Sequence, residues 1–79
     1  MNAIEQRLLR TVAAEFGVPV TKVDLDTDLI EDLGMTDTTG GDLIAALVEE
    51  FDFKIADEKI EDFLTVQDIL DFLEEELKA

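Results

Sequence analysis

The sequence predicts an all-α domain, a four-helix bundle of three long helices and one short helix, with a long loop between the first two. Apolar residues recur at steps of three and four in separate segments, which is the period of a helix with one buried face. Capping and turn residues separate these segments. Because 79 residues suffice for one small apolar core, we expect a single domain over residues 1–79.

The first helix is expected over residues 3–16. Its apolar residues lie at helical spacing and are Ile4, Leu8, Leu9, Val12, Ala13 and Phe16. Gly17 suits the left-handed position that closes many helices, and Pro19 prevents the helix from continuing. The helix should therefore end near Phe16.

Residues 18–37 form a long connection that we expect to pack on the bundle rather than to act as a linker. Its regularly spaced apolar residues are Val20, Val23, Leu25, Leu29, Ile30 and Leu33. The acidic residues Asp24, Asp26 and Asp28 resemble the start of a calcium loop. Leu29 and Met35, however, stand where that loop needs glycine and glutamate. We therefore expect no EF-hand and no metal site.

The second helix is predicted from the apolar residues Leu43, Ile44, Ala46, Leu47, Val48 and Phe51. Thr39 followed three residues later by Asp42 predicts a capping box, which places Gly40 and Gly41 in the first turn. A glycine costs roughly 1 kcal/mol relative to alanine inside a helix. The first turn should therefore be soft, and the segment before Thr39 is not expected to be firmly helical.

A short helix is predicted over residues 57–63, with Ile60 and Phe63 facing inward. A helix of so few residues is not stable alone, so it should depend on packing against the bundle. Thr65 should cap the last helix, with Asp68 as its capping partner. The buried stripe of this helix is predicted as Val66, Ile69, Leu70, Phe72, Leu73 and Leu77. The core expected from the last three helices is Leu43, Ala46, Leu47, Phe51, Ile60, Val66, Ile69 and Phe72.

The charge balance limits the partners. Six basic residues against 21 acidic ones give a net charge of −15. Binding to nucleic acid or to anionic membranes requires clustered Lys and Arg, which this chain lacks. Strong like-sign charge favours a soluble monomer. The first residues resemble neither a secretory signal nor a membrane span, so we expect a cytoplasmic protein.

The segment from Asp32 to Leu43 reads D-L-G-M-T-D-T-T-G-G-D-L, with Phe51 eight residues further on. It resembles the central signature of acyl carrier proteins, D-L-G-A-D-S-L-D-x-V-E-L, with a phenylalanine at the same spacing. Residues 55–57 (I-A-D) are similar to the family's I-P-D, and residues 65–68 (T-V-Q-D) to its T-V-x-D. The resemblance spans essentially the whole chain without a gap and implies the acyl-carrier-protein type of four-helix bundle.

In that family a serine at the position of Asp37 accepts the 4′-phosphopantetheine arm, and this chain contains no serine. A carboxylate cannot accept the arm as an alcohol does, and a mixed anhydride would hydrolyse readily, so we expect no cofactor. Asp37 either stabilises the start of the helix through the helix dipole or imitates the phosphate of a loaded carrier. For the nearby hydroxyls of Thr36, Thr38 and Thr39 we favour capping over modification.

The resemblance also implies partners. The acidic second helix of the family docks on basic patches of partner enzymes, which carries over to Asp42, Glu49 and Glu50; a solvated face is the alternative. We therefore expect a carrier-like protein of fatty-acid, polyketide or peptide biosynthesis, without a phosphopantetheine arm, that docks on enzymes. A genuine carrier modified at a nearby threonine is the alternative. An enzyme is not expected, because no nucleophile and base can be paired in a chain without His, Cys or Ser.

Overall fold

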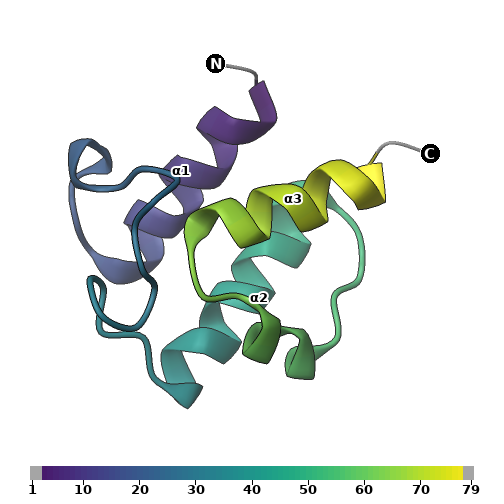
Figure 1. The fold of residues 1–79 in the computed structure, drawn as a ribbon. Coiled ribbons are helices and arrows are strands. Elements are labelled where there is room, and N and C mark those ends of the chain that lie inside the picture. The colour runs from purple at the N-terminus through teal and green to yellow at the C-terminus, as the bar shows by residue number, and fades with distance from the viewer. Residues whose placement is uncertain (1–2, 78–79) are drawn as a thin grey trace.

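The computed structural model describes residues 3–77, and within them it contains helices, turns and loops but no strand (Figure 1). The elements in chain order are α1 (Ala3–Phe16), the 3-10 helix η1 (Val20–Lys22), α2 (Asp37–Phe51), the 3-10 helix η2 (Asp57–Asp62) and α3 (Val66–Leu77). The predicted all-α fold with three long helices is confirmed. The predicted short helix is η2, and η1 is an additional turn that the sequence pattern did not indicate.

The end of α1 follows the prediction. Gly17 has a φ of 66°, in the left-handed region. The N–H of Val18 donates to the carbonyl of Ala13 at 3.0 Å, and the N–H of Gly17 to that of Ala14 at 3.3 Å. These two bonds form a Schellman motif, which satisfies carbonyls that the helix itself leaves without a partner.

The connection between α1 and α2 packs on the bundle, as predicted (Figure 1, left side). Val23 and Leu29 are buried, and the N–H of Leu29 donates to the carbonyl of Leu64 at 2.9 Å. Asp28 and Thr65 also form an isolated antiparallel bridge. The prediction was wrong for Val20 and Ile30, which are 45% and 53% exposed. Val20 begins the 3-10 helix η1 and Ile30 lies in a turn, and neither backbone position directs the side chain into the core.

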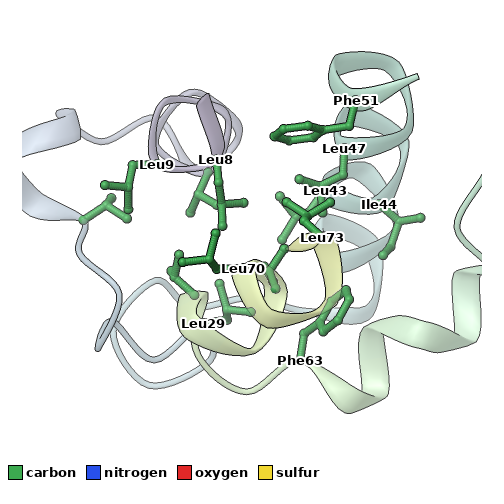
Figure 2. Close-up of a cluster of buried hydrophobic side chains, with 14 of the residues drawn as sticks. Leu8, Leu9, Leu29, Leu43, Ile44, Leu47, Phe51, Phe63, Leu70 and Leu73 are labelled. Atoms are coloured by element: carbon green, nitrogen blue, oxygen red, sulfur yellow. The ribbon is translucent and has the colours of Figure 1, made fainter. Parts of the chain in front are cut away.

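Side chains from the three long helices converge on one core, to which the loop adds Leu29 (Figure 2). Within residues 3–77, nine side chains are almost completely buried: Leu8, Val12, Leu29, Leu43, Ile44, Leu47, Val66, Ile69 and Leu73. None of the helices in residues 3–77 has the length and apolar character required to cross a bilayer.

Several predicted core positions are only partly buried, because they lie at the edges of the bundle. Ala46 lines a groove between α1 and α2. Ile60 lies at the edge where η2 packs on α2, over Gly40. Phe72 lies against the rings of Phe53 and Phe63, with centroid separations of 6.1 and 5.5 Å.

Both ends of the predicted α3 stripe can be compared with the structure. Leu77, at the end of α3, is 40% exposed, so its predicted burial was wrong. The start of α3 is as predicted: the N–H of Asp68 donates to Thr65 Oγ1 at 3.3 Å, and the N–H of Thr65 donates to Asp68 Oδ2 at 3.1 Å. Phe63 is buried at the end of η2, also as predicted.

Candidate functional site

The candidate site begins at the N-terminus of α2, which Thr36 caps. The N–H of Thr39 donates to Thr36 Oγ1 at 3.3 Å, and the N–H of Thr36 donates to Thr39 Oγ1 at 2.8 Å. Together these bonds form a capping box in which threonine takes the place of the usual glutamate. The predicted box of Thr39 and Asp42 was therefore wrong. The pair Thr39 and Asp42 resembles the usual capping box more closely than the pair Thr36 and Thr39 does, because its second residue is acidic. The two threonine side chains nevertheless accept from the same two backbone N–H groups that a usual capping box satisfies.

Because the cap is Thr36, the residues before Thr39 are helical, contrary to the prediction. The N–H of Gly40 donates to the carbonyl of Thr36 at 2.7 Å, which is a regular helical bond. A Cβ atom on Gly40 would lie 3.0 Å from Ile60 Cγ1, whereas one on Gly41 would meet nothing within 4 Å. Gly40 therefore lets η2 approach the second turn of α2 closely, and Gly41 has no such packing role.

Asp37 is the first residue of α2, not a residue just before the helix, and it is exposed. Its side chain makes no hydrogen bond or ion pair within residues 3–77, so capping by Asp37 is not seen. A carboxylate in the first turn is nevertheless stabilised by the partial positive charge of the helix N-terminus. The structure thus presents an unpaired carboxylate to solvent at the position singled out by the sequence.

The three nearby hydroxyls differ in their surroundings. Thr36 and Thr39 bond to each other's backbone, as favoured from the sequence, and their Oγ1 atoms are 3.3 Å apart. Thr38 is exposed and has no hydrogen bond from its side chain in the described part of the chain. The capping favoured from the sequence is therefore confirmed for Thr36 and Thr39, whereas Thr38 makes no capping bond within the described residues.

The solvent-facing side of α2 carries a line of residues spaced at three and four: Thr38, Asp42, Ala45 and Glu49. We call these four residues the outer line of α2. The buried residues of the helix lie on the other side and are Gly40, Leu43, Ile44, Leu47 and Phe51. Asp42 and Glu49 are seven residues apart, which is two helical turns and about 10 Å along the axis. The structure therefore places these two carboxylates on one face.

Glu50, the third acidic residue proposed for docking, lies apart from this line. Its Oε2 accepts from Arg7 Nε at 2.9 Å, and its backbone carbonyl accepts from Arg7 Nη2. The guanidinium of Arg7 also lies 4.6 Å from the centroid of the Phe51 ring. Arg7 therefore ties α1 to the C-terminal turn of α2. Reasoning from the sequence missed this contact, because no local pattern links residues 43 positions apart.

The two carboxylates of the outer line, Asp42 and Glu49, are exposed to solvent. No Lys or Arg lies within ion-pair distance of Asp42 or Glu49 within residues 3–77, where the paired cations are Arg7 and Lys59. The same described residues contain no group of His, Cys, Asp or Glu side chains that could hold a metal ion.

The chain is similar to a known protein family. The family model described as "Phosphopantetheine attachment site" matches residues 6–73. The matched range runs from the first turn of α1 into α3 and includes Asp37 and the whole outer line of α2.

Proposed function

The chain belongs to the phosphopantetheine attachment site family, and from this premise we propose that it is a carrier-type protein that acts by docking on biosynthetic enzymes without an arm. Family membership supports a carrier role in biosynthesis, and such carrier domains are not themselves catalysts. The observation that carries the proposal is the exposed carboxylate of Asp37, a residue that the resemblance of the sequence aligns with the family's serine. The whole chain contains no serine that could replace it.

The residues at the start of α2 do not fit the attachment of 4′-phosphopantetheine. The carboxylate of Asp37 cannot form a stable phosphodiester. The hydroxyls of Thr36 and Thr39 are engaged with the backbone that they cap, and modification of either would remove part of the capping box. Only Thr38 offers a free hydroxyl, so a carrier modified at Thr38 is the specific alternative.

We further propose that Asp42 and Glu49 form the docking face, on cytoplasmic enzymes of fatty-acid, polyketide or peptide assembly that carry basic patches. Two unpaired carboxylates on one face steer a basic partner during its approach and fix its orientation. Glu50 contributes less, because Arg7 already neutralises its charge. The small side chain of Ala45 lies between the two carboxylates and leaves room for a partner to approach.

The absence of the arm is tested by mass. We expect the intact mass to stay unchanged after incubation with coenzyme A and a broad-specificity phosphopantetheinyl transferase. The Asp37→Ser variant, treated identically, asks whether a hydroxyl alone restores attachment. A mass gain of one phosphopantetheine in the unmodified sequence that is lost in Thr38→Val would refute the arm-free proposal and establish the alternative.

The docking face is tested by binding to the same transferase, with association rates measured at low and at physiological salt. Reversing Asp42 and Glu49 to lysine should slow association on the order of tenfold at low salt, since steering acts mainly on the on-rate. Reversing Glu75 and Glu76, both exposed on α3, gives the same change in net charge and is the matched control.

If the Asp42/Glu49 and Glu75/Glu76 reversals slow association equally, the attraction comes from the net charge alone, and the docking face is ruled out. If neither pair matters while Val48→Ala weakens binding, the contact is apolar and the outer line of α2 is a solvated surface. Either result leaves the mass experiment unaffected, so the two parts of the proposal can fail separately.

A further inference from the structure

One helix departs from the acidic character of the chain. Residues 6–14 of α1 contain Arg7 and Arg10 and no acidic residue, although 21 of the 79 residues of the chain are acidic. The solvent side of α1 is formed by Ala3, Gln6, Arg10 and Ala14, all exposed. This side of the protein therefore differs in charge from the outer line of α2.

A shallow groove of about 320 Å³ lies between this helix and η1. We call it the α1–η1 groove; its lining residues are Gln6, Leu9, Arg10, Val20 and Val23. Leu9 and Val23 are 8% and 6% exposed, whereas Val20 is 45% exposed at the edge. The groove thus has an apolar floor of two nearly buried core side chains and an apolar edge, Val20, that is in contact with water.

Arg10 provides the charged group of the groove. Its Nη2 donates to Gln6 Oε1 at 3.2 Å, and within residues 3–77 no carboxylate lies within ion-pair distance of it. Lys22 of η1, between the two valines in sequence, likewise has no carboxylate partner in the described part of the chain. By contrast, Arg7 is paired with Glu50. The guanidinium of Arg10 is therefore free to receive an anion.

We propose that the α1–η1 groove binds an acidic segment of a partner protein, which places an apolar side chain against Leu9, Val20 and Val23 and a carboxylate on Arg10. Charge complementarity at the groove itself selects this occupant, because the repulsion from the net charge of −15 acts over longer distances and is screened at physiological salt. A basic segment would be repelled by Arg10, and a purely apolar one would cover the guanidinium without giving it a partner. A planar guanidinium pairs well with a carboxylate, in one or two hydrogen bonds.

This surface is separate from the docking face on α2, and its existence does not require the function proposed above. It would give the protein two contacts of opposite charge preference. Asp42 and Glu49 would meet a basic surface, and Arg10 an acidic one.

The experiment uses the ¹⁵N-labelled full chain and an acetylated, amidated probe peptide of sequence Ala-Leu-Asp-Leu-Ala, with Ala-Leu-Asn-Leu-Ala as its neutral counterpart. We expect saturable amide shifts at residues 6–10 and 20–23. The neutral peptide should bind about two- to fivefold more weakly, as is typical of an exposed ion pair. Arg10→Gln should remove this difference between the peptides. Lys54→Gln, which also removes one exposed positive charge, should preserve it.

Several results would overturn the inference. Absence of saturable shifts would show that the groove is only a solvated surface. Equal affinity for the two peptides, or an unchanged difference in Arg10→Gln, would show that Arg10 does not receive the carboxylate. Shifts of the same amides that grow with protein concentration, without peptide, would identify a second copy of this chain as the occupant.

Discussion

Replacing each of the two adjacent glycines of α2 by alanine separates helix propensity from packing. Both residues lie inside α2, where alanine is favoured over glycine by about 1 kcal/mol. A Cβ atom on Gly41 would meet nothing within 4 Å. Gly41→Ala should therefore stabilise the protein by about 1 kcal/mol, which for a domain of this size raises the Tm by about 4–8 °C.

Gly40→Ala gains the same propensity but loses packing. Its new Cβ would lie 3.0 Å from Ile60 Cγ1, whereas carbon atoms at their optimal separation are about 3.5–4.0 Å apart. Overpacking of this kind costs about 1–3 kcal/mol. The variant should therefore be unchanged or up to about 2 kcal/mol less stable, so the two alanine variants should differ by about 1–3 kcal/mol.

Urea unfolding and thermal melting at fixed ionic strength give the free energy of unfolding and the Tm of both variants. The Ile60→Ala background supplies the control, because it removes the Cγ1 atom that the new Cβ would meet. There Gly40→Ala should become stabilising, with a coupling energy of the same size as the packing cost. The reasoning fails if Gly40→Ala is as stabilising as Gly41→Ala in the unmodified protein, or if its penalty persists without the Ile60 side chain.

Further predictions concern the cap of α2, the contact between Arg7 and Glu50, the core and the net charge. Thr36→Ala should cost about 0.5–2 kcal/mol in urea unfolding through loss of the cap, whereas Thr38→Ala should stay within about 0.5 kcal/mol of the unmodified protein. Equal losses would contradict the assignment of the cap. Arg7→Gln should cost about 0.7–2 kcal/mol by the same assay. It removes an ion pair worth about 0.2–1 kcal/mol, since both partners are 42% exposed, and a cation–π contact with Phe51 worth about 0.5–1 kcal/mol. Leu47→Ala should cost about 2–5 kcal/mol in urea unfolding, since Leu47 is fully buried. The Tm should rise with added NaCl, because salt screens repulsion within a chain of net charge −15; a flat or falling dependence would show that the charges are already dispersed or paired.

Local patterns predicted the elements that local bonds define. Gly17 ends α1 and Thr65 pairs with Asp68 at the start of α3, and in both cases the partners lie within five residues of each other. The start of α2 was misplaced by three residues. There, the sequence contains two possible capping pairs, and in the structure the helix begins after the first of them, Thr36 with Thr39.

Contacts between distant segments were outside the reach of these patterns. The pairing of Arg7 with Glu50 depends on how α1 and α2 are packed. The exposure of Val20 beside the α1–η1 groove depends on how η1 lies against α1. Hydrophobicity alone placed Ile30 among the packed residues of the loop, but an irregular backbone turns it outward, and 53% of its surface is exposed.

The helical period, the acidic balance and the absence of serine follow directly from the amino-acid sequence. Each is a property of composition or of neighbours within one or two helical turns. Helix packing, by contrast, leaves the face shared by Asp42 and Glu49 exposed, pairs Glu50 with α1, and places Ile60 over Gly40. These features arise because burying the apolar sides of three helices in one core fixes how the helices face one another, and that orientation determines which distant side chains meet.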